Sequence, residues 1–255
     1  MKNKYRTIWI SDVHLGSKDA KADLLLNFLK YNTANTYYIN GDAIDFWKIK
    51  QNKWKWKKTH TEVIRKFLKI SKESRVVYVI GNHDEVLRSY VSHEIRLGKI
   101  EFVNKTEHIG VNGKRYIVIH GDMFDGIGKI APWLAYVGDK SYDILLSLNT
   151  YYNYARHKLG FGYWSFSKVL KRKVKGAVDF VLNFEHNIVD YCRRKFYAGA
   201  IIGHTHTPVI KSIEGIDILN SGDWVESCSA LVENFDGTFE IIIWDKFYEE
   251  ITDSN

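Results

Sequence analysis

Five short polar blocks, each preceded by a run of apolar residues, constrain the fold of this chain more than any other feature. The blocks are Asp12-Val-His14, Gly41-Asp42, Gly81-Asn82-His83-Asp84, His120-Gly121-Asp122 and Gly203-His204-Thr205-His206. The runs before them are rich in β-branched and aromatic residues and have the length of buried strands. Because open α/β sheets bind ligands at the carboxyl ends of their parallel strands, we expect one sheet edge to gather all five blocks.

The residue types in these blocks indicate a metal site. Carboxylate and amide oxygens combined with imidazoles, without a thiolate, suit manganese, iron or zinc. Two neighbouring ions need a shared ligand, and Asp42 is the natural bridge because ligand pairs flank it in the chain. Two ions about 3.5–4 Å apart lower the pKa of a bound water and hold the oxygens of an in-line phosphoryl displacement. The pattern therefore predicts hydrolysis of a phosphate ester or anhydride.

The five blocks carry unequal weight as evidence. Asp-x-His and Gly-Asp are both common at ordinary turns, whereas Gly-Asn-His-Asp and Gly-His-Thr-His are rarer. Their common context, a strand followed by a loop, argues against coincidence. Taken in order, the blocks resemble the signature of the calcineurin-like metallophosphoesterases from about residue 8 to about residue 225.

This resemblance implies a fold and a ligand set. The fold is a four-layer α/β/β/α sandwich, an α/β class. The first metal ion would be held by Asp12, His14 and His206, and the second by Asn82, His120 and His204, with Asp42 bridging. His83 would act as the acid or as a stabiliser of the transition state, and Asp84 would orient its imidazole. Asp45 either supports a metal ligand or caps a helix that begins near Trp47.

The rest of the chain fits one metallophosphoesterase domain over residues 1–255. The sequence has two prolines and no low-complexity linker. Apolar stripes over residues 22–29 and 63–70 predict helices that cover a sheet. The runs 229–233 and 239–244 flank Asp236-Gly237, which predicts a hairpin. Residues 125–195 contain no metal block and read as a helical insertion, or cap.

The insertion is aromatic and basic, and it is the best sequence clue to the substrate. Aromatic and basic helices beside a phosphate-cleaving site suit an acylated anionic substrate at a membrane surface. Two other interpretations stay open. The aromatic residues of the insertion could belong to the hydrophobic core, or a basic groove could bind nucleic acid, with Trp54 and Trp56 stacked on bases. The net charge of +7 permits either anionic partner. The candidate substrate contacts are Arg88, Arg156, Trp133, Tyr163 and Trp164.

A narrower resemblance favours an acylated lipid substrate over nucleic acid. Residues 9–16, 40–47 and 220–226 are similar to the branch of UDP-2,3-diacylglucosamine diphosphatases. That branch implies a manganese enzyme that converts a nucleotide-linked lipid to lipid X and UMP in lipid A biosynthesis. At residue 83, where enzymes of this branch often have arginine, this chain has the histidine of the general phosphoesterase pattern.

The sequence also suggests where the protein acts. The first predicted strand begins within a few residues of Met1, and no apolar run approaches the roughly 18 residues of a membrane span. We therefore expect a cytoplasmic protein, peripheral on the cytoplasmic face of the inner membrane. The sequence does not indicate an oligomeric state.

Overall fold

The structure of the protein, a computed structural model, describes residues 2–93, 96–125 and 183–244. The chain divides into two compact units, residues 1–123 with 188–255, and residues 124–187. Most of the second unit lies outside the described residues, and with it the candidate contacts Trp133, Arg156, Tyr163 and Trp164. Where it is described, the Phe124 ring meets the Phe184 ring edge-on, with the centroids 6.2 Å apart.

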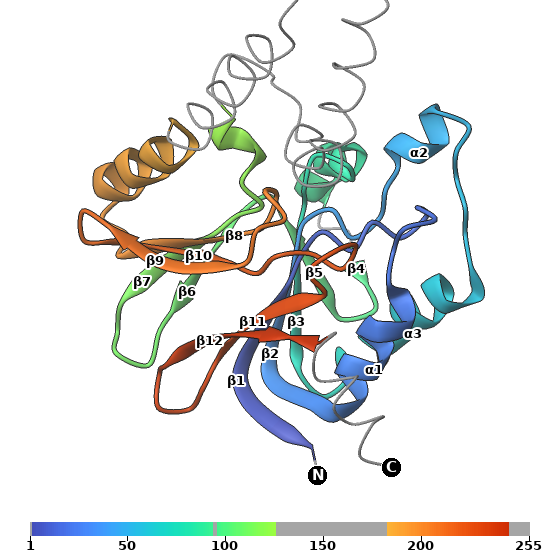
Figure 1. The fold of residues 1–255 in the computed structure, drawn as a ribbon, viewed down its shortest axis with the longest axis horizontal. Coiled ribbons are helices and arrows are strands. Elements are labelled where there is room, and N and C mark those ends of the chain that lie inside the picture. The colour runs from blue at the N-terminus through green and yellow to red at the C-terminus, as the bar shows by residue number, and fades with distance from the viewer. Residues whose placement is uncertain (1, 94–95, 126–182, 245–255) are drawn as a thin grey trace, which may run out of the picture. The chain divides into compact units, whose positions relative to one another are not determined.

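A seven-stranded mixed sheet forms the first half of the larger unit (Figure 1). Its parallel strands are joined by helices α1 (Ala22–Tyr31) and α3 (Lys58–Ile70), while β11, β12 and β4 pair antiparallel. In spatial order its strands are β12 (Phe239–Ile243), β11 (Ser229–Glu233), β1 (Asn3–Ile10), β2 (Asn32–Asn40), β3 (Arg75–Val79), β5 (Ile100–Val103) and β4 (Arg96–Leu97).

A five-stranded sheet forms the second half. Strands β7, β8 and β10 are parallel, and the outer strands β6 and β9 pair antiparallel with β7 and β10. In spatial order the strands are β6 (Thr106–Ile109), β7 (Arg115–Val118), β8 (Gly199–Ile202), β10 (Ile216–Asn220) and β9 (Val209–Ile213). The loops between strands contain the short helix α2 (Trp47–Lys50) and the 3₁₀ helices η1 (Glu85–His93) and η2 (Asp122–Phe124).

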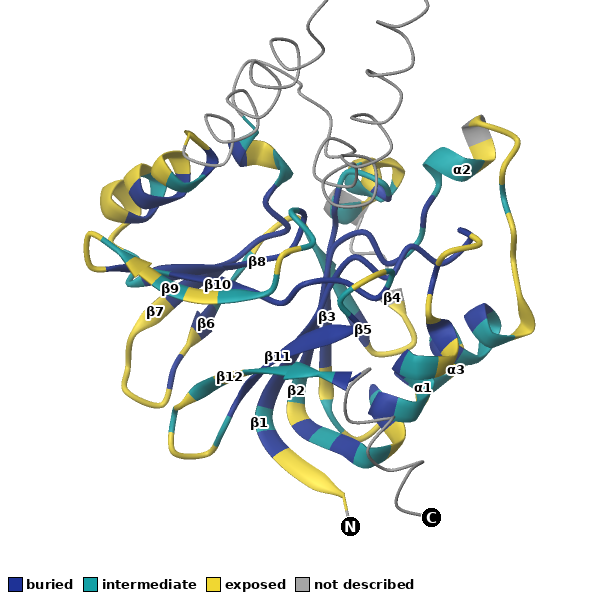
Figure 2. Ribbon diagram, viewed as in Figure 1, coloured by how far each residue is buried: buried dark blue, intermediate teal, exposed yellow. Residues whose placement is uncertain are grey.

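The two sheets pack face to face on a shared apolar core. Trp9 of β1 and Leu231 of β11 face the same buried cluster as Val118 of β7 and Ile201 of β8. Trp9 also stacks on Tyr38 of β2, with ring centroids 5.5 Å apart. Figure 2 shows β11 and the second half of β1 as buried, while the start of β1 near the N-terminus is exposed. Such strands, buried on both faces, are the reason for the apolar runs in the sequence.

Helices cover the outer face of each sheet. On α1 the predicted stripe is buried at Ala22, Leu25 and Leu29, and Phe28 extends it. On the second sheet, helical residues 188–195 are tied down by an ion pair between Arg193 and Glu214 and by a hydrogen bond from Lys105 to Tyr191. The α/β/β/α order of layers, the two helices and the hairpin of β11 and β12 confirm the predictions. Of the predicted insertion, residues 183–195 are helical and the stretch 126–182 lies outside the described residues.

One expectation about the strands needs correction. The five blocks do not follow strands of one sheet, because β1, β2 and β3 belong to the seven-stranded sheet while β7 and β8 belong to the five-stranded sheet. Apolar runs identify buried parallel strands but contain no information about which sheet each strand joins. The blocks still meet, because the two packed sheets place the carboxyl ends of these five strands at the same end of the sandwich.

A buried carboxylate, Glu233, links the two sheets toward the opposite ends of their strands. It lies at the end of β11 and is fully buried, and it pairs with Arg6 of β1. Its Oε2 is 2.9 Å from His108 Nε2 on β6, and its Oε1 accepts a hydrogen bond from the backbone N of Val111. Burial raises the pKa of Glu233, but the hydrogen bonds and charges of His108 and Arg6 outweigh it and hold that pKa below its ordinary value.

We expect Glu233→Gln to lower the free energy of unfolding by about 3 kcal/mol at pH 7, because it leaves Arg6 beside a neutral group. Since the folded-state pKa of Glu233 lies below the unfolded value of 4.5, its stabilising effect is complete above that pH and is lost as the pH falls through the folded pKa. Denaturant unfolding of both proteins from pH 7 to pH 3 measures this difference. A gap between them that stays constant with pH would contradict the assignment.

Candidate metal centre

Backbone hydrogen bonds join four of the five blocks in pairs, the first with the second and the fourth with the fifth. Asp12 N donates to Gly41 O over 3.1 Å, and His14 N donates to Asp42 O over 2.9 Å. On the other sheet, Gly203 N donates to His120 O over 2.9 Å. These bonds continue the strand pairing past the strand ends, so the loops are held as firmly as the sheets. Figure 2 shows the same loops as buried.

The backbone at the predicted ligands is unusual. Five of the seven have a left-handed conformation, with φ between 52° and 68°: Asp12, His14, Asp42, His204 and His206. Residues other than glycine rarely adopt this conformation, and each such residue costs about 1–3 kcal/mol. Five residues with this conformation lie in one cluster of side chains. The fold therefore holds these residues in place against the preference of their backbone.

The glycines of the blocks make room for ligands of other blocks. A Cβ on Gly81 would lie 2.1 Å from Asp42 Oδ1, and a Cβ on Gly203 would lie 2.5 Å from Asp12 Oδ2. A Cβ on Gly41 would lie 2.2 Å from Nδ1 of His120. Any larger residue would therefore displace a predicted ligand.

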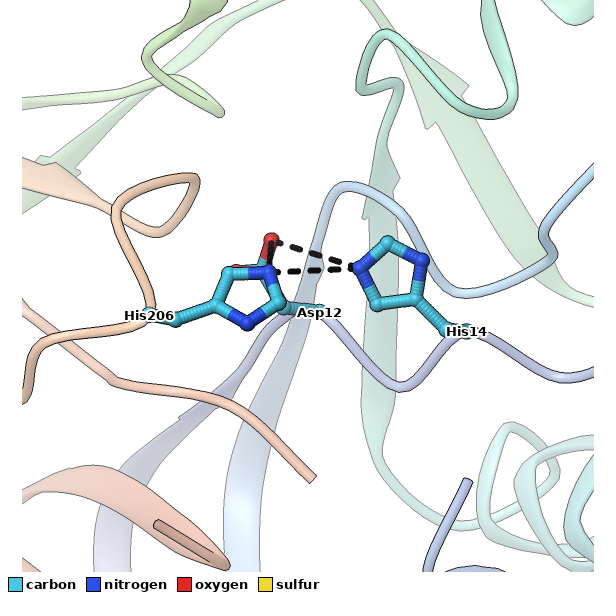
Figure 3. Close-up of side chains that lie close together, drawn as sticks. All are labelled: Asp12, His14 and His206. Carbon is cyan, nitrogen blue, oxygen red and sulfur yellow. Dashed lines mark hydrogen bonds and ion pairs between the residues drawn. The ribbon is translucent and has the colours of Figure 1, made fainter. Parts of the chain in front are cut away.

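The first group of predicted ligands is Asp12, His14 and His206 (Figure 3). Asp12 Oδ1 lies 3.3 Å from His206 Nε2 and 3.9 Å from His14 Nε2, and the two imidazole nitrogens are 3.3 Å apart. Asp12 Oδ2 accepts a hydrogen bond from His204 N, but the buried Oδ1 has no hydrogen-bond partner among the described residues. A buried anionic oxygen without a donor, facing two imidazole nitrogens, is the environment that a divalent cation fits.

The second group is built around His120. Its Nδ1 donates to Asn40 O over 3.0 Å, which leaves Nε2 free to face the site. Nε2 lies 3.2 Å from both Asp42 Oδ2 and Asn82 Oδ1, and the His204 ring centroid is 5.2 Å from that of His120. All the donors here are oxygen or imidazole nitrogen, so this group also fits a divalent ion.

Asp42 stands between the two groups. It forms one possible metal cluster with Asp12 and His120, and a second with His14 and His83. Its Oδ1 accepts a hydrogen bond from His83 N over 2.8 Å, so backbone fixes the carboxylate in this shared position. The structure thus brings the seven residues predicted as ligands close together, and the role of Asp42 as the bridge stays a prediction.

The charges in this centre reinforce one another. Burial alone would keep Asp12 and Asp42 protonated, yet the neighbouring histidines hold the pKa of both carboxyl groups below the ordinary value. Burial would likewise keep His206 neutral, but the Asp12 carboxylate raises the pKa of His206 to about 9. The same negative field that attracts protons to the imidazoles would attract a divalent cation.

His83 is oriented by Asp45, which corrects the prediction that Asp84 does so. His83 Nδ1 lies 2.9 Å from Asp45 Oδ1, and Asp45 Oδ2 lies 3.6 Å from His14 Nδ1. Burial raises the pKa of Asp45, but its contacts with His14 and His83 outweigh it and leave that pKa below normal. Asp45 therefore supports two rings, and it also accepts a hydrogen bond from Lys48 N at the start of α2. These contacts agree with support of a predicted metal ligand by Asp45, whereas the N-cap residue of α2 is Phe46 and not Asp45.

Asp84 holds backbone instead. Its carboxylate accepts hydrogen bonds from Gly81 N and Ala43 N, at 2.6 and 3.0 Å, and from the Tyr78 hydroxyl at 2.5 Å. These contacts leave neither oxygen directed at His83. Burial and the charge of Asp42 raise the pKa of Asp84 to about 6. Asp84 was predicted to orient His83 because it is the next residue in the chain. The turn after β3 instead directs the Asp84 side chain back into the protein.

Trp47 is a site residue that the sequence analysis missed. Its ring stacks on His83, with centroids 4.0 Å apart and planes 28° from parallel. Two signals were available: its position two residues after Asp45, and its place at the end of the segment 40–47 on which the narrower resemblance rests. Arg88, a candidate phosphate contact, donates to Asp122 Oδ2 over 2.7 Å. A phosphate contact by Arg88 stays a prediction.

We expect Gly81→Ala to weaken metal binding by about 10- to 100-fold, because the new methyl group would displace the Asp42 carboxylate. Titration of the metal-free protein with Mn²⁺, followed calorimetrically, measures this change. Gly110→Ala is the matched control, since Gly110 also has no positive φ and its added Cβ would meet only side-chain atoms that are not predicted ligands, of Asn112 at 3.0 Å, Tyr116 at 3.4 Å and Glu233 at 3.6 Å. Equal affinities in the two variants would contradict the packing argument.

Comparison with known proteins places this geometry in context. Residues 5–208 match the family model described as calcineurin-like phosphoesterase. Among solved structures, a phosphoesterase from E. coli is 14% identical, with 93% of this chain and 98% of that chain covered and a TM-score of 0.45. A hypothetical protein from Pyrococcus horikoshii is 12% identical, with 97% and 93% covered and a TM-score of 0.47. No curated protein sequence matches the chain.

Proposed function

Since this chain belongs to the calcineurin-like phosphoesterase family, we propose that it hydrolyses the pyrophosphate of UDP-2,3-diacylglucosamine to 2,3-diacylglucosamine 1-phosphate (lipid X) and UMP. Membership makes the protein a metal-dependent phosphoester hydrolase, and its clusters of Asp and His can hold metal. The finer assignment is supported by residues 40–47 and 220–226, which resemble the diphosphatase branch, and by the residues beside His83 described below.

We assign two divalent cations to the centre, with manganese first and iron or zinc as alternatives. One would bind Asp12, His14 and His206, the other would bind Asn82, His120 and His204, and Asp42 would bind both. When bound, such ions activate water near neutral pH and neutralise charge on the reacting phosphate. The protein holds the predicted ligand side chains in place with backbone hydrogen bonds. Asp12 accepts one from His204 N, Asp42 accepts one from His83 N, and His120 donates one to Asn40 O.

His83 is the proton donor in this proposal. Asp45 can only accept a hydrogen bond while it is ionised, so His83 Nδ1 carries a proton toward it. His83 Nε2 then faces the centre, 4.0 Å from Asp42 Oδ2. A proton on Nε2 can pass to the oxygen of the departing phosphate as the bond to phosphorus breaks. The Trp47 ring covers one face of the imidazole and restricts its rotation.

The observation that carries the substrate assignment is an aromatic and cationic surface next to His83. This surface, the tryptophan segment, consists of residues 46–58. Trp54 stacks on Trp56, with centroids 5.2 Å apart, and Phe46 stacks on Trp54 at 6.3 Å. Lys55 N donates to Gly16 O, which joins the segment to the loop that holds His14. Its lysines at positions 48, 50, 53, 55, 57 and 58 meet no acidic residue within the segment.

Indole rings flanked by lysines suit a substrate with phosphate charge and apolar chains. The same combination draws a protein to an anionic bilayer, so we propose peripheral association with the cytoplasmic face of the inner membrane. No helix in the described ranges has the length and apolar character needed to span a bilayer. Arg156, Trp133, Tyr163 and Trp164 in the segment 125–195 remain proposed substrate contacts.

A second candidate function is a phosphodiesterase or nuclease, favoured by the stacked pair of Trp54 and Trp56 among lysines. One assay separates the two. The manganese-loaded protein is incubated with detergent-dispersed UDP-2,3-diacylglucosamine, with single-stranded RNA and DNA, and with cyclic nucleotides, and products are identified by mass spectrometry. UMP and lipid X support the lipid assignment. Cleavage of oligonucleotides or cyclic nucleotides without lipid cleavage would replace it with the second function.

We expect Trp56→Ala to raise the KM for the lipid substrate about tenfold and to leave hydrolysis of bis(p-nitrophenyl) phosphate unchanged, because an exposed indole contributes about 1–3 kcal/mol to a stacked or apolar contact. Trp56 is 39% exposed and has no contact with the predicted ligands, so its loss does not disturb the metal centre. Phe196→Ala, which removes an exposed ring elsewhere, is the control. Parallel losses on both substrates would argue against a role in substrate recognition.

A further inference from the structure

An apolar cavity of about 240 Å³ lies behind the metal loops, on the helix-covered side of the seven-stranded sheet. One wall is formed by Val13 and Ala43, which adjoin the predicted ligands Asp12 and Asp42 in the chain. The opposite wall is formed by Val63 and Phe67 of α3, and Ile100 of β5 lies at the base. Protein interiors contain few voids larger than a water molecule, so a space of this size calls for an occupant.

The lining of the cavity excludes a polar occupant. None of the described residues around it carries a charge. Tyr78 is the deepest residue with a polar side-chain atom, and its hydroxyl already donates to Asp84. A cavity lined without charged groups offers few hydrogen bonds to water or to a phosphate, whereas apolar molecules enter such cavities readily.

The cavity cannot close by movement of α3, because both ends of that helix are fixed. At its start, His60 Nδ1 accepts a hydrogen bond from Gly16 N over 3.1 Å. Just after its end, Ser74 Oγ donates to Ala34 O over 2.8 Å. The wall next to the metal loops is fixed by Asp84, which binds the backbone of Ala43. The space is therefore part of the fold.

The cavity opens to the surface beside η1 and β4. Tyr90 and Leu97 line it and are 49% and 45% exposed. An extended, flexible apolar molecule can enter between them and leave a polar end group in water. We infer that this cavity is a binding site for one alkyl chain, such as a fatty acyl chain. The cavity is a second site, distinct from the metal centre, because none of the described residues that line it is a predicted metal ligand, although Phe46 of the tryptophan segment is among them.

Binding of two alkyl probes tests the site, with native mass spectrometry and calorimetry on the full chain. The probes are myristic acid and monomyristoyl phosphatidylglycerol, which distinguish a free chain from a chain with a lipid headgroup. We expect one chain per protein and an affinity that rises from hexanoic to myristic acid and then levels off as the cavity fills. Absence of saturable binding, or binding independent of chain length, would overturn the inference.

Two substitutions locate the bound chain. Val63→Phe fills the cavity from α3, and Leu97→Asp places a charge at its mouth, on an exposed position where folding is unaffected. Each is expected to weaken binding at least tenfold. Ile210→Asp on β9 is the matched control, since Ile210 is 42% exposed and lies on the other sheet. Binding that survives Leu97→Asp, or that falls equally with Ile210→Asp, would place the chain elsewhere. Because binding is measured without hydrolysis, failure here leaves the proposed diphosphatase activity untouched.

Discussion

Asp42→Ala is expected to abolish metal-dependent hydrolysis and to reduce the bound metal from two ions per chain to one or none. Asp42 belongs to one possible metal cluster with Asp12 and His120 and to another with His14 and His83. Its removal would take away the carboxylate nearest to His120, whose Nε2 lies 3.2 Å from Asp42 Oδ2 but 4.0 Å from Asp12 Oδ1. Elemental analysis after dialysis measures the metal, and manganese-dependent release of p-nitrophenol from bis(p-nitrophenyl) phosphate measures the activity.

Asp19→Ala supplies the control for this change, because Asp19 is exposed and follows the first block without contacting the centre. Circular dichroism checks that both variants fold. The assignment of Asp42 as the shared ligand fails if the variant binds two ions per chain, or if it keeps more than a trace of wild-type activity.

His83→Ala is expected to lower kcat by about 10²–10⁴-fold, the range for a positioned acid or base, without changing the metal content. The loss should be smaller for a p-nitrophenyl ester than for an alkyl phosphodiester, because p-nitrophenolate departs without needing a proton. Asp45→Asn should lower kcat by about 10- to 100-fold, since it removes the acceptor that orients the ring.

The double variant of His83 and Asp45 separates orientation from other effects. If Asp45 acts through His83, adding Asp45→Asn to His83→Ala costs little further activity, because the ring that it orients is already gone. Independent, multiplicative losses would show that Asp45 acts mainly through His14, its other partner. Identical losses on aryl and alkyl substrates would remove His83 from the role of proton donor.

The sequence predicted the strands, the two crossover helices and the terminal hairpin, because each depends on a local pattern. Convergence of strand ends predicted that the five blocks would meet, and the family resemblance named the seven residues within them. The sequence also predicted two packed sheets, but not which strand joins which sheet, because Trp9 and Tyr116 look alike as buried residues whichever sheet they join.

The supporting residues of the centre were harder to predict than the ligands. Asp84 follows His83 directly, so sequence proximity favoured it as the orienting carboxylate, yet the turn after β3 directs it to Gly81 N and Tyr78. Asp45 lies beside His83 although the two are 38 residues apart, and a hydrogen bond from Phe46 N to His83 O joins their loops. Trp47 and Glu233 likewise act through contacts distant in sequence, for which no local pattern exists.

The glycines at positions 41, 81 and 203 have a consequence for how such a centre can change over evolutionary time. Each leaves room for a ligand that another block supplies: His120, Asp42 and Asp12 respectively. A block transplanted alone from a relative with different side-chain sizes would therefore collide with its new neighbours. We therefore expect these interlocked blocks to change together, and substrate range to change more easily in a segment outside them, such as residues 46–58.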